Sequence, residues 1–279
     1  MISKNLAQRI IIAAVAIPII IFLVFSGGDV FLAFILLLAA IGIIEYLLQG
    51  GLRPQSPFFI IPFIGAVGAV WLTGIGRGAY GSLSLLGVFL LIGMMLAVGK
   101  EPVDKLFARL TYIVWGSFYI GLLYPFVYLI RGEAGWMEAA PGRWWLSFLL
   151  GSLWLGDTAA MFFGKSFGRH KLAPAVSPNK TIEGFLGGFV GVLVVAMVFK
   201  IFWLRDIAAY HLIALALLIA LFGQLGDLAE SLWKRSLAIK DSSHIIPGHG
   251  GVLDRFDSLL FSAPVVYVYL KYIINAPWL

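Results

Sequence analysis

The chain has 279 residues, of which 61% are hydrophobic and only 12% are charged. Soluble globular domains carry about 25% charged residues, so this composition excludes an ordinary soluble domain and indicates a membrane protein. The absence of cysteine excludes disulfides and thiolate metal sites, and the net charge of +6 fits basic cytoplasmic loops of a membrane protein better than nucleic-acid binding.

The hydropathy pattern predicts an all-α, polytopic integral membrane protein, because about nine stretches approach the length that crosses a bilayer. These stretches are 10–25, 30–48, 57–73, 81–98, 112–130, 144–163, 184–204, 208–229 and 256–275. The first stretch follows a basic lead as in a signal peptide, but it has no Ala-x-Ala pattern and is expected to be retained. Prolines blur the third stretch, so eight or ten spans stay open.

The distribution of basic residues predicts the sidedness of the chain. Most of the 20 Lys and Arg residues fall in loops on the side of the N-terminus. The positive-inside rule therefore predicts a cytoplasmic N-terminus, with loops 164–183 and 230–255 also in the cytoplasm.

Composition shifts near residue 144, after a segment rich in Gly, Glu and Pro. We therefore expect residues 1–143 to form a transmembrane scaffold, with lipid access or dimer contacts as candidate roles, and residues 144–279 to form the catalytic region. Within the latter, the pairs Gly184/Gly188 and Gly187/Gly191 are small-xxx-small patterns, which allow close helix packing within a subunit or between two.

Ionisable residues inside the spans are functional candidates because they are costly in a bilayer. Glu45 falls near a predicted interface, where we expect its carboxylate to reach headgroup water. Asp157 falls within the sixth stretch, as a metal ligand or a helix-packing carboxylate. Asp227 is followed by Glu230 and Lys234 at spacings of three and four, which places these side chains on one helical face.

A second pair of acids begins the last span. Asp254 and Asp257 are three residues apart, and an antiparallel pair of spans would bring Asp254 opposite Asp227. Carboxylate oxygens without thiolates suit Mg²⁺ or Mn²⁺ much better than Zn²⁺. A solvated, merely salt-bridged helix end is the alternative.

The loops beside these acids are rich in groups that bind phosphate. Gly248, Gly250 and Gly251 allow backbone N–H groups to approach an anion closely. Lys180 and Thr181 just precede a predicted helix in the other cytoplasmic loop. Cationic donors near the acids are Lys234, Arg235, Lys240, His249 and Arg255.

One segment resembles a known family signature: residues 231–258, SLWKRSLAIKDSSHIIPGHGGVLDRFDS. It resembles the pattern of the phosphatidate cytidylyltransferases, or CDP-diacylglycerol synthases, which is Ser-x-x-Lys-Arg, Lys-Asp, Pro-Gly-His-Gly-Gly and Asp-Arg-x-Asp. The matching run includes Asp241, and the segment SPNKTIEG, which begins at Ser177, also resembles the family. Strong likeness covers about residues 156–260.

The resemblance implies an enzyme of the bacterial inner membrane that converts CTP and phosphatidic acid into CDP-diacylglycerol and pyrophosphate. It implies a homodimer that depends on a divalent cation. The carboxylates favour Mg²⁺ or Mn²⁺ as this cation, the basic loops predict an active site facing the cytoplasm, and a second cation stays open. Catalytic residues are expected to be Asp227, Asp254, Lys234, Arg235 and Lys240. Substrate-binding residues are expected to be Lys180, Thr181, Ser177, Asp241, His249, Gly250, Gly251 and Arg255. Expected metal ligands are Asp227 and Asp254, with Glu230 and Asp257 as additional ligands and Asp157 as a further candidate.

Two other functions stay open. A CTP-dependent lipid kinase would transfer the γ-phosphate of CTP and release CDP instead of pyrophosphate. A cation- or proton-coupled transporter would use the intramembrane acids as an ion path, although this reading leaves the basic, glycine-rich loops unexplained.

Overall fold

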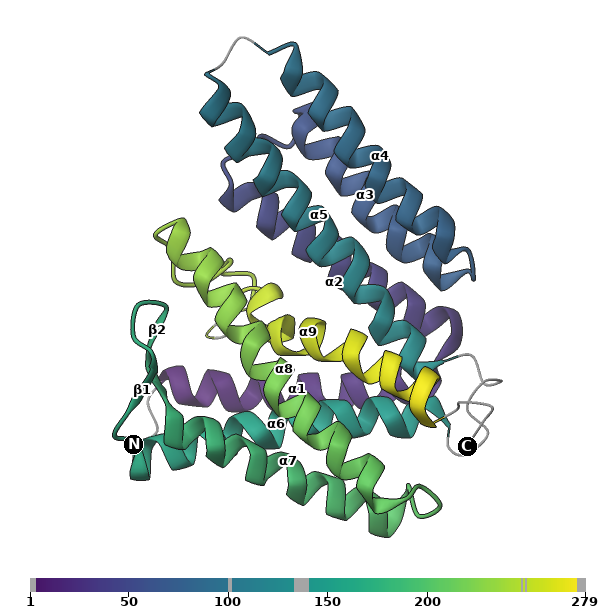
Figure 1. The fold of residues 1–279 in the computed structure, drawn as a ribbon, viewed down its shortest axis with the longest axis vertical. Helices are drawn as coiled ribbons and strands as arrows, with labels where there is room; N and C mark the ends of the chain where they lie inside the picture. The colour runs from purple at the N-terminus through teal and green to yellow at the C-terminus, as the bar shows by residue number, and fades with distance from the viewer. Residues whose placement is uncertain (1–3, 100–101, 133–140, 247, 249, 275–279) are drawn as a thin grey trace. The chain divides into compact units, whose positions relative to one another are not determined.

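The computed structural model describes residues 4–99, 102–132, 141–246, 248 and 250–274. Most of these residues are helical, and a pair of short strands lies between α6 and α7 (Figure 1). The helices are α1 (Lys4–Ser26), α2 (Gly28–Gln49), α3 (Pro57–Gly74), α4 (Gly78–Ala97), α5 (Val103–Arg131), α6 (Gly142–Phe167), α7 (Ile182–Phe202), α8 (Ala209–Ser236) and α9 (Leu253–Tyr269), which continues as the π-helical segment η1 (Leu270–Ile274).

The helices confirm the predicted all-α, polytopic membrane class. In the described part of the chain, eight helices are long and apolar enough to cross a membrane. They correspond to the second through ninth predicted stretches. The described apolar part of α1, Ala14–Ser26, is shorter. The cytoplasmic placement of the N-terminus stays a prediction.

Two helices extend well beyond their predicted apolar stretches. Helix α5 begins at Val103, ahead of the predicted start at 112, and α8 continues to Ser236, past the predicted end at 229. The apolar run of each helix ends where charged residues begin, but the helical hydrogen bonds continue past that point. The last turn of α8 contains Lys234 and Arg235, whose positive charges favour the C-terminal end of a helix dipole.

A β-hairpin in the loop after α6 was not predicted. Strands β1 (Lys171–Ala173) and β2 (Ser177–Thr181) pair antiparallel, with Lys171 opposite Thr181 and Ala173 opposite Ser177. At its end, the hydroxyl of Thr181 caps α7 by accepting a hydrogen bond from the backbone N–H of Gly184 at 3.1 Å. The hairpin therefore leads directly into a well-capped helix.

Glu183 fastens the segment that enters the hairpin. Its carboxylate accepts a hydrogen bond from the backbone N–H of Arg169 at 3.0 Å, and another from that of His170 at 3.2 Å. The His170 ring also lies 2.7 Å from Glu183. Through these contacts Glu183 holds the chain between α6 and β1.

The chain forms two compact units. The first unit comprises Met1–Ile19, Ser26–Tyr128 and Asp241–Arg255, and the second comprises Ile20–Phe25, Leu129–Lys240 and Phe256–Leu279. In the first unit α3 and α4 lie side by side (Figure 1). The rings of Tyr46 and Tyr112 stack with centroids 4.4 Å apart, which joins α2 to α5. The functional division at residues 143 and 144 stays a prediction.

In the second unit α6 and α7 pack side by side (Figure 1), and the glycines of α7 make this packing possible. A Cβ atom at Gly187 would lie 2.4 Å from the Cβ of Phe163, and one at Gly191 would lie 2.8 Å from the Cβ of Ala159. The small-xxx-small pattern therefore permits close packing within the chain, which is one of the two arrangements that the sequence left open.

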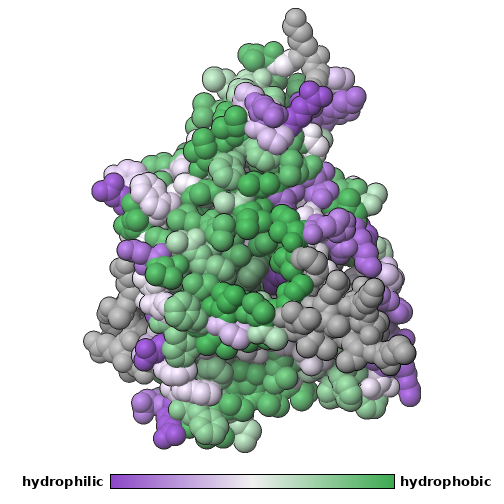
Figure 2. All heavy atoms as spheres, turned by 180° about the vertical axis from the view of Figure 1, so that it is seen from behind, coloured by the Kyte–Doolittle hydropathy of each residue, from purple (hydrophilic) through white to green (hydrophobic). Residues whose placement is uncertain are grey.

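Large apolar side chains are exposed along the helices. Figure 2 shows hydrophobic residues over much of the face that it presents. On α7, for example, Leu186, Val190 and Met197 are exposed. Such faces suit contact with lipid, since the backbone polar groups are satisfied within each helix.

Candidate active site

A cavity of about 550 Å³ lies within the second unit. Residues of α6, the hairpin, α7 and α8 form its wall. The polar side chains in this wall belong to Asp157, Lys165, Asn179, Lys180, Thr181, Gln224 and Asp227, and the large apolar ones to Met161, Leu172 and Phe185. A cavity with charged groups and apolar walls can receive a ligand that is part phosphate and part hydrocarbon.

Asp227 and Lys180 form an ion pair in this wall. The Nζ of Lys180 lies 2.7 Å from Oδ2 of Asp227, and the side chains are 19% and 37% exposed, respectively. The other carboxylate oxygen of Asp227 accepts a hydrogen bond from the Ser231 hydroxyl at 3.2 Å. The pair joins the hairpin to α8 in the wall of the cavity, so a positive and a negative charge lie side by side there.

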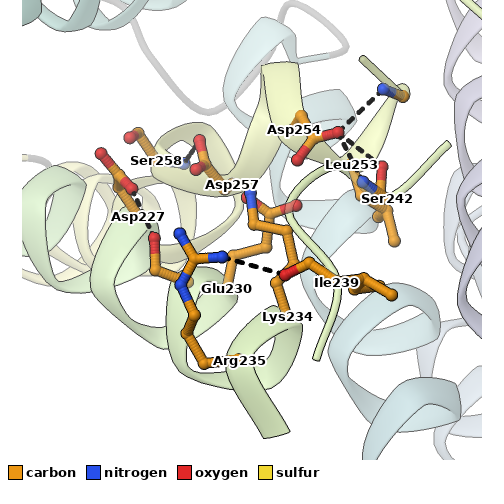
Figure 3. A network of polar contacts seen from close by, with 12 residues as sticks. Asp227, Glu230, Lys234, Arg235, Ile239, Ser242, Leu253, Asp254, Asp257 and Ser258 are labelled. Carbon is orange, nitrogen blue, oxygen red and sulfur yellow. Dashed lines mark hydrogen bonds and ion pairs between the residues drawn. The ribbon is translucent and has the colours of Figure 1, made fainter. Parts of the chain in front are cut away.

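A second cluster of charged side chains lies around Glu230, which belongs to the same helix, α8. The Glu230 side chain is only 1% exposed and lies 3.2 Å from Nζ of Lys234, one turn further along α8. The carboxyl group of Asp257 on α9 is hydrogen-bonded to that of Glu230 and also interacts electrostatically with Asp227. Asp257 additionally accepts a hydrogen bond from the backbone N–H of Ser258 at 2.6 Å (Figure 3).

The acids of the second unit carry the oxygen atoms that a hard divalent cation takes as ligands. Asp227 and Asp257 repel each other when both are ionised, and a bound cation would relieve that repulsion. Among the described residues no group of three or more His, Cys, Asp or Glu side chains is arranged to hold a metal. Mg²⁺ commonly takes only one or two protein carboxylates and completes its ligands with water and substrate phosphates.

Asp254, at the start of α9 in the first unit, organises the loop that precedes it. Its Oδ2 atom accepts hydrogen bonds from the backbone N–H of Ser242 at 2.8 Å, the Ser242 hydroxyl at 2.9 Å and the backbone N–H of Gly251 at 2.8 Å (Figure 3). Asp254 and Asp227 belong to different units, so their predicted convergence stays a prediction.

The predicted exposure of Glu45 to water was wrong. The sequence favoured a carboxylate reaching headgroup water, but the residue is only 2% exposed. Its carboxylate accepts hydrogen bonds from Ser242 and Ser243 and from the backbone N–H groups of Val252 and Leu253. Glu45 therefore lies inside the first unit, against Ser242, Ser243 and the start of α9, and does not face water.

The other residues that the sequence predicted for the site differ in their contacts and in their exposure. Arg235 donates a hydrogen bond to the carbonyl of Ile239 at 3.0 Å (Figure 3) and to that of Val176 at 3.4 Å. Gly250 has φ of 81°, a left-handed conformation that favours glycine. Exposed positions are held by Lys240, Asp241 and Arg255, Ser177 begins β2, and His249 lies outside the described residues.

Two polar cavity residues were missed by the sequence analysis, Asn179 and Gln224. Gln224 falls three residues before Asp227 on the same helix, so the helical spacing that grouped Glu230 with Asp227 could have found it. Asn179 gave no comparable signal, because its place depends on the unpredicted hairpin.

The apolar helices and the cavity define a polytopic membrane protein with charged side chains in the wall of a partly apolar cavity. The chain belongs to the cytidylyltransferase family, whose model matches residues 7–273. This membership confirms the resemblance seen in the signature segment, and it makes the chain a nucleotidyltransferase.

Similar proteins extend the likeness over nearly the whole chain. A phosphatidate cytidylyltransferase of Staphylococcus saprophyticus is 34% identical over 94% of this chain and 98% of its own length. One of Bacillus subtilis is 33% identical over 95% of this chain and 98% of its own length. The likeness therefore also includes the first half of the chain, which lies outside the strongly similar residues 156–260.

Proposed function

We propose that this chain is a phosphatidate cytidylyltransferase, which converts CTP and phosphatidic acid into CDP-diacylglycerol and pyrophosphate. A phosphate oxygen of phosphatidic acid attacks the α-phosphorus of CTP, and the bond from that phosphorus to the oxygen bridging to the β-phosphate breaks. The attacking oxygen is already ionised at neutral pH, so the step needs no general base. The observation that carries the proposal is the Lys180–Asp227 pair in a cavity with apolar walls.

In this proposal the residues of the second unit bind and orient the reacting phosphates. Lys180 and Lys234 neutralise phosphate charge, while Met161, Leu172 and Phe185 face the glycerol and acyl part of the lipid. Phosphoryl transfer depends on positioning and charge neutralisation more than on covalent help from the protein. Further phosphate contacts are proposed for Arg235, Lys240, His249 and Arg255, and Asp241 is proposed as a further substrate-binding residue.

Mg²⁺ or Mn²⁺ is the proposed cofactor, with a second cation as an extension. Asp227 and Asp254 are the proposed principal ligands, with Glu230 and Asp257 as additional ones and Asp157 in the cavity wall as a further candidate. When bound there, the cation would offset the negative charge that opposes attack of one phosphate on another.

The proposed setting is the inner membrane of a bacterium, with the active site on the cytoplasmic side, where CTP is present. The excess of basic residues in loops 164–183 and 230–255 supports this sidedness. A homodimer is the proposed assembly, and it rests on the family resemblance.

Two positions of radioactive label test the proposed reaction. Purified protein in detergent is given phosphatidic acid with CTP labelled at either the α- or the γ-phosphate. The proposal predicts that α-label enters the lipid while γ-label appears in pyrophosphate. A lipid kinase would place γ-label in the lipid and release CDP, which would contradict the proposal. Absence of any labelled product with both substrates would favour the transporter.

A further inference from the structure

The carboxylate of Glu45 is placed where an isolated charge is unfavourable. It lies near the C-terminal end of α2, an apolar helix, and it is almost fully buried. Exposed carbonyl groups give this end of a helix a partial negative charge, which repels a carboxylate. Burial adds a desolvation cost. Specific partners must therefore hold the group there.

Those partners all come from the segment that precedes and begins α9. Oε1 of Glu45 accepts hydrogen bonds from the Ser243 hydroxyl at 2.5 Å and the backbone N–H of Val252 at 2.9 Å. Oε2 accepts from the Ser242 hydroxyl at 3.2 Å and the backbone N–H of Leu253 at 3.0 Å. Each oxygen thus lies within hydrogen-bond distance of one hydroxyl and one amide, and the single proton of the Ser242 hydroxyl is shared with Asp254.

The two amides belong to the N-terminal end of α9. A helix leaves its first N–H groups without partners inside the helix, and an acid accepts hydrogen bonds from them favourably. Glu45 supplies this acid from a residue 207 positions earlier than Val252. Gln49, one turn further along α2, donates a hydrogen bond from Nε2 to the Ser242 carbonyl at 2.7 Å.

Ser242 connects this anchor to Asp254. Its hydroxyl lies 3.2 Å from Oε2 of Glu45 and 2.9 Å from Oδ2 of Asp254, and its backbone N–H donates to the same Asp254 oxygen. Gly251 closes the arrangement, since a Cβ atom there would lie 2.0 Å from the Ser242 hydroxyl and 2.6 Å from Oε1 of Glu45. The position of Asp254 therefore depends on how Glu45 holds the loop.

We infer that Glu45 is a positioning residue for the reaction: it fixes the loop at Ser242 and Ser243 and the first turn of α9, and so sets the orientation of the Asp254 carboxylate. This inference rests on the proposed function. Glu45 acts through its hydrogen bonds to the loop and touches no substrate. The contact of Glu45 with the loop affects more than stability, because the loop carries groups proposed to bind CTP and the cation.

The test compares four full-length proteins purified in detergent: the natural chain, Glu45→Gln, Glu45→Asp and Asp29→Asn. Asp29 is an exposed acid in the first turn of the same helix and provides the matched control. Initial rates are measured while CTP, phosphatidic acid and Mg²⁺ are varied in turn. The thermal unfolding midpoint of each protein is measured in the same detergent.

Glu45→Gln replaces one acceptor oxygen by an NH₂ group that faces a backbone N–H. We expect kcat/KM for CTP to fall about 10- to 100-fold, the usual effect of losing a group that supports a ligand-binding residue. The KM for CTP or the half-saturating Mg²⁺ concentration should rise, while the KM for phosphatidic acid stays unchanged. Glu45→Asp keeps the charge and should recover part of the activity, and Asp29→Asn should stay within about twofold.

Natural kinetic constants in Glu45→Gln would overturn the inference. A fall in kcat alone that matches the fraction of unfolded protein would overturn it too, because lost folding changes no half-saturation constant. If Glu45→Gln does not fold, Ser243→Ala removes one hydrogen bond and retains the carboxylate. It should lower kcat/KM for CTP about threefold, and unchanged constants there would contradict the inference equally.

Hydrogen exchange separates this inference from the proposed function, because it needs no substrate. The amides of Val252 and Leu253 should be protected in the natural chain and exchange faster in Glu45→Gln. Unprotected amides in the natural chain, or equal protection in the variant, refute the hold of Glu45 on the loop. A natural chain with protected amides that is inactive with CTP and phosphatidic acid refutes the proposed function instead.

Discussion

Asp227 and Glu45 are both carboxylates in apolar helices, yet their surroundings differ in kind. Glu45 is 2% exposed and accepts hydrogen bonds from two hydroxyls and two backbone amides. The Asp227 side chain is 37% exposed in the wall of a cavity and pairs with a lysine. A carboxylate bound by backbone amides fixes the shape of a loop. A carboxylate paired with a lysine beside a cavity can exchange that partner for a cation.

Replacing Asp227 by Asn is the change that should have the largest effect. It removes the charge proposed to hold the cation but keeps the size of the side chain. We expect the rate of CDP-diacylglycerol formation to fall about a thousandfold, equivalent to about 4 kcal/mol of barrier. Labelled CTP measures the rate, and thermal unfolding in detergent should show a nearly unchanged midpoint.

Asp206→Asn is the matched control for this variant, since Asp206 is an exposed acid between α7 and α8 in the same unit. It should retain full activity. Full turnover by Asp227→Asn would show that Asp227 has no part in the reaction. It would also contradict the difference in role between Asp227 and Glu45.

Replacing Lys180 by Met should have the second largest effect. The variant keeps the apolar stem but loses the ammonium that lies 2.7 Å from Asp227. We expect a fall of about 100-fold in kcat/KM for CTP, because charge-assisted contacts to a phosphate contribute about 1.5–3 kcal/mol each. The exposed Lys171, on the other strand of the hairpin, supplies the control Lys171→Met. Equal losses in the two variants would mean that general charge, and not this position, matters.

Gly251→Ala tests the surroundings of Glu45, the second carboxylate of the comparison. The added Cβ would meet the Ser242 hydroxyl and the Glu45 carboxylate, and overpacking of this kind costs about 1–3 kcal/mol. We expect a lower unfolding midpoint together with a loss of about tenfold in activity. Gly68→Ala in α3, where the Cβ has nothing within 4 Å, should change neither. An unaffected Gly251→Ala would show that the loop does not need its close contact with Glu45.

Glu183→Gln should have the smallest effect. One amide oxygen replaces two carboxylate oxygens that accept backbone hydrogen bonds from Arg169 and His170. Loss of about one hydrogen bond corresponds to about 1 kcal/mol, so activity should fall no more than about fivefold. Amide exchange should accelerate at Arg169 and His170, and unchanged exchange there would mean that Glu183 does not hold the hairpin entrance.

The sequence carried different amounts of information about these features. Apolar windows located the spanning helices because burial in lipid demands a long apolar run. The grouping of Glu230 and Lys234 with Asp227 needed only helical spacing, and the structure retains the Glu230–Lys234 pair. The ends of α5 and α8 were misplaced because hydropathy marks the bilayer and not the end of helical hydrogen bonding.

What could not be predicted depends on contacts between distant segments. Glu45 and Val252 are 207 positions apart, and no local pattern in either segment indicates their contact. The hairpin was missed because its strands are short and polar, without the alternating apolar pattern of a half-buried strand. Its absence from the prediction also hid the ion pair between Lys180 and Asp227.

Binding of Mn²⁺ to the purified protein tests the central claim most directly, since it reports on the cation without turnover. Electron paramagnetic resonance counts free Mn²⁺ in the presence of CTP for the natural chain and for Asp227→Asn. The account predicts that the natural chain with CTP takes up Mn²⁺ tightly and that Asp227→Asn loses this uptake beyond what CTP alone binds. Equal uptake by both proteins would contradict the account.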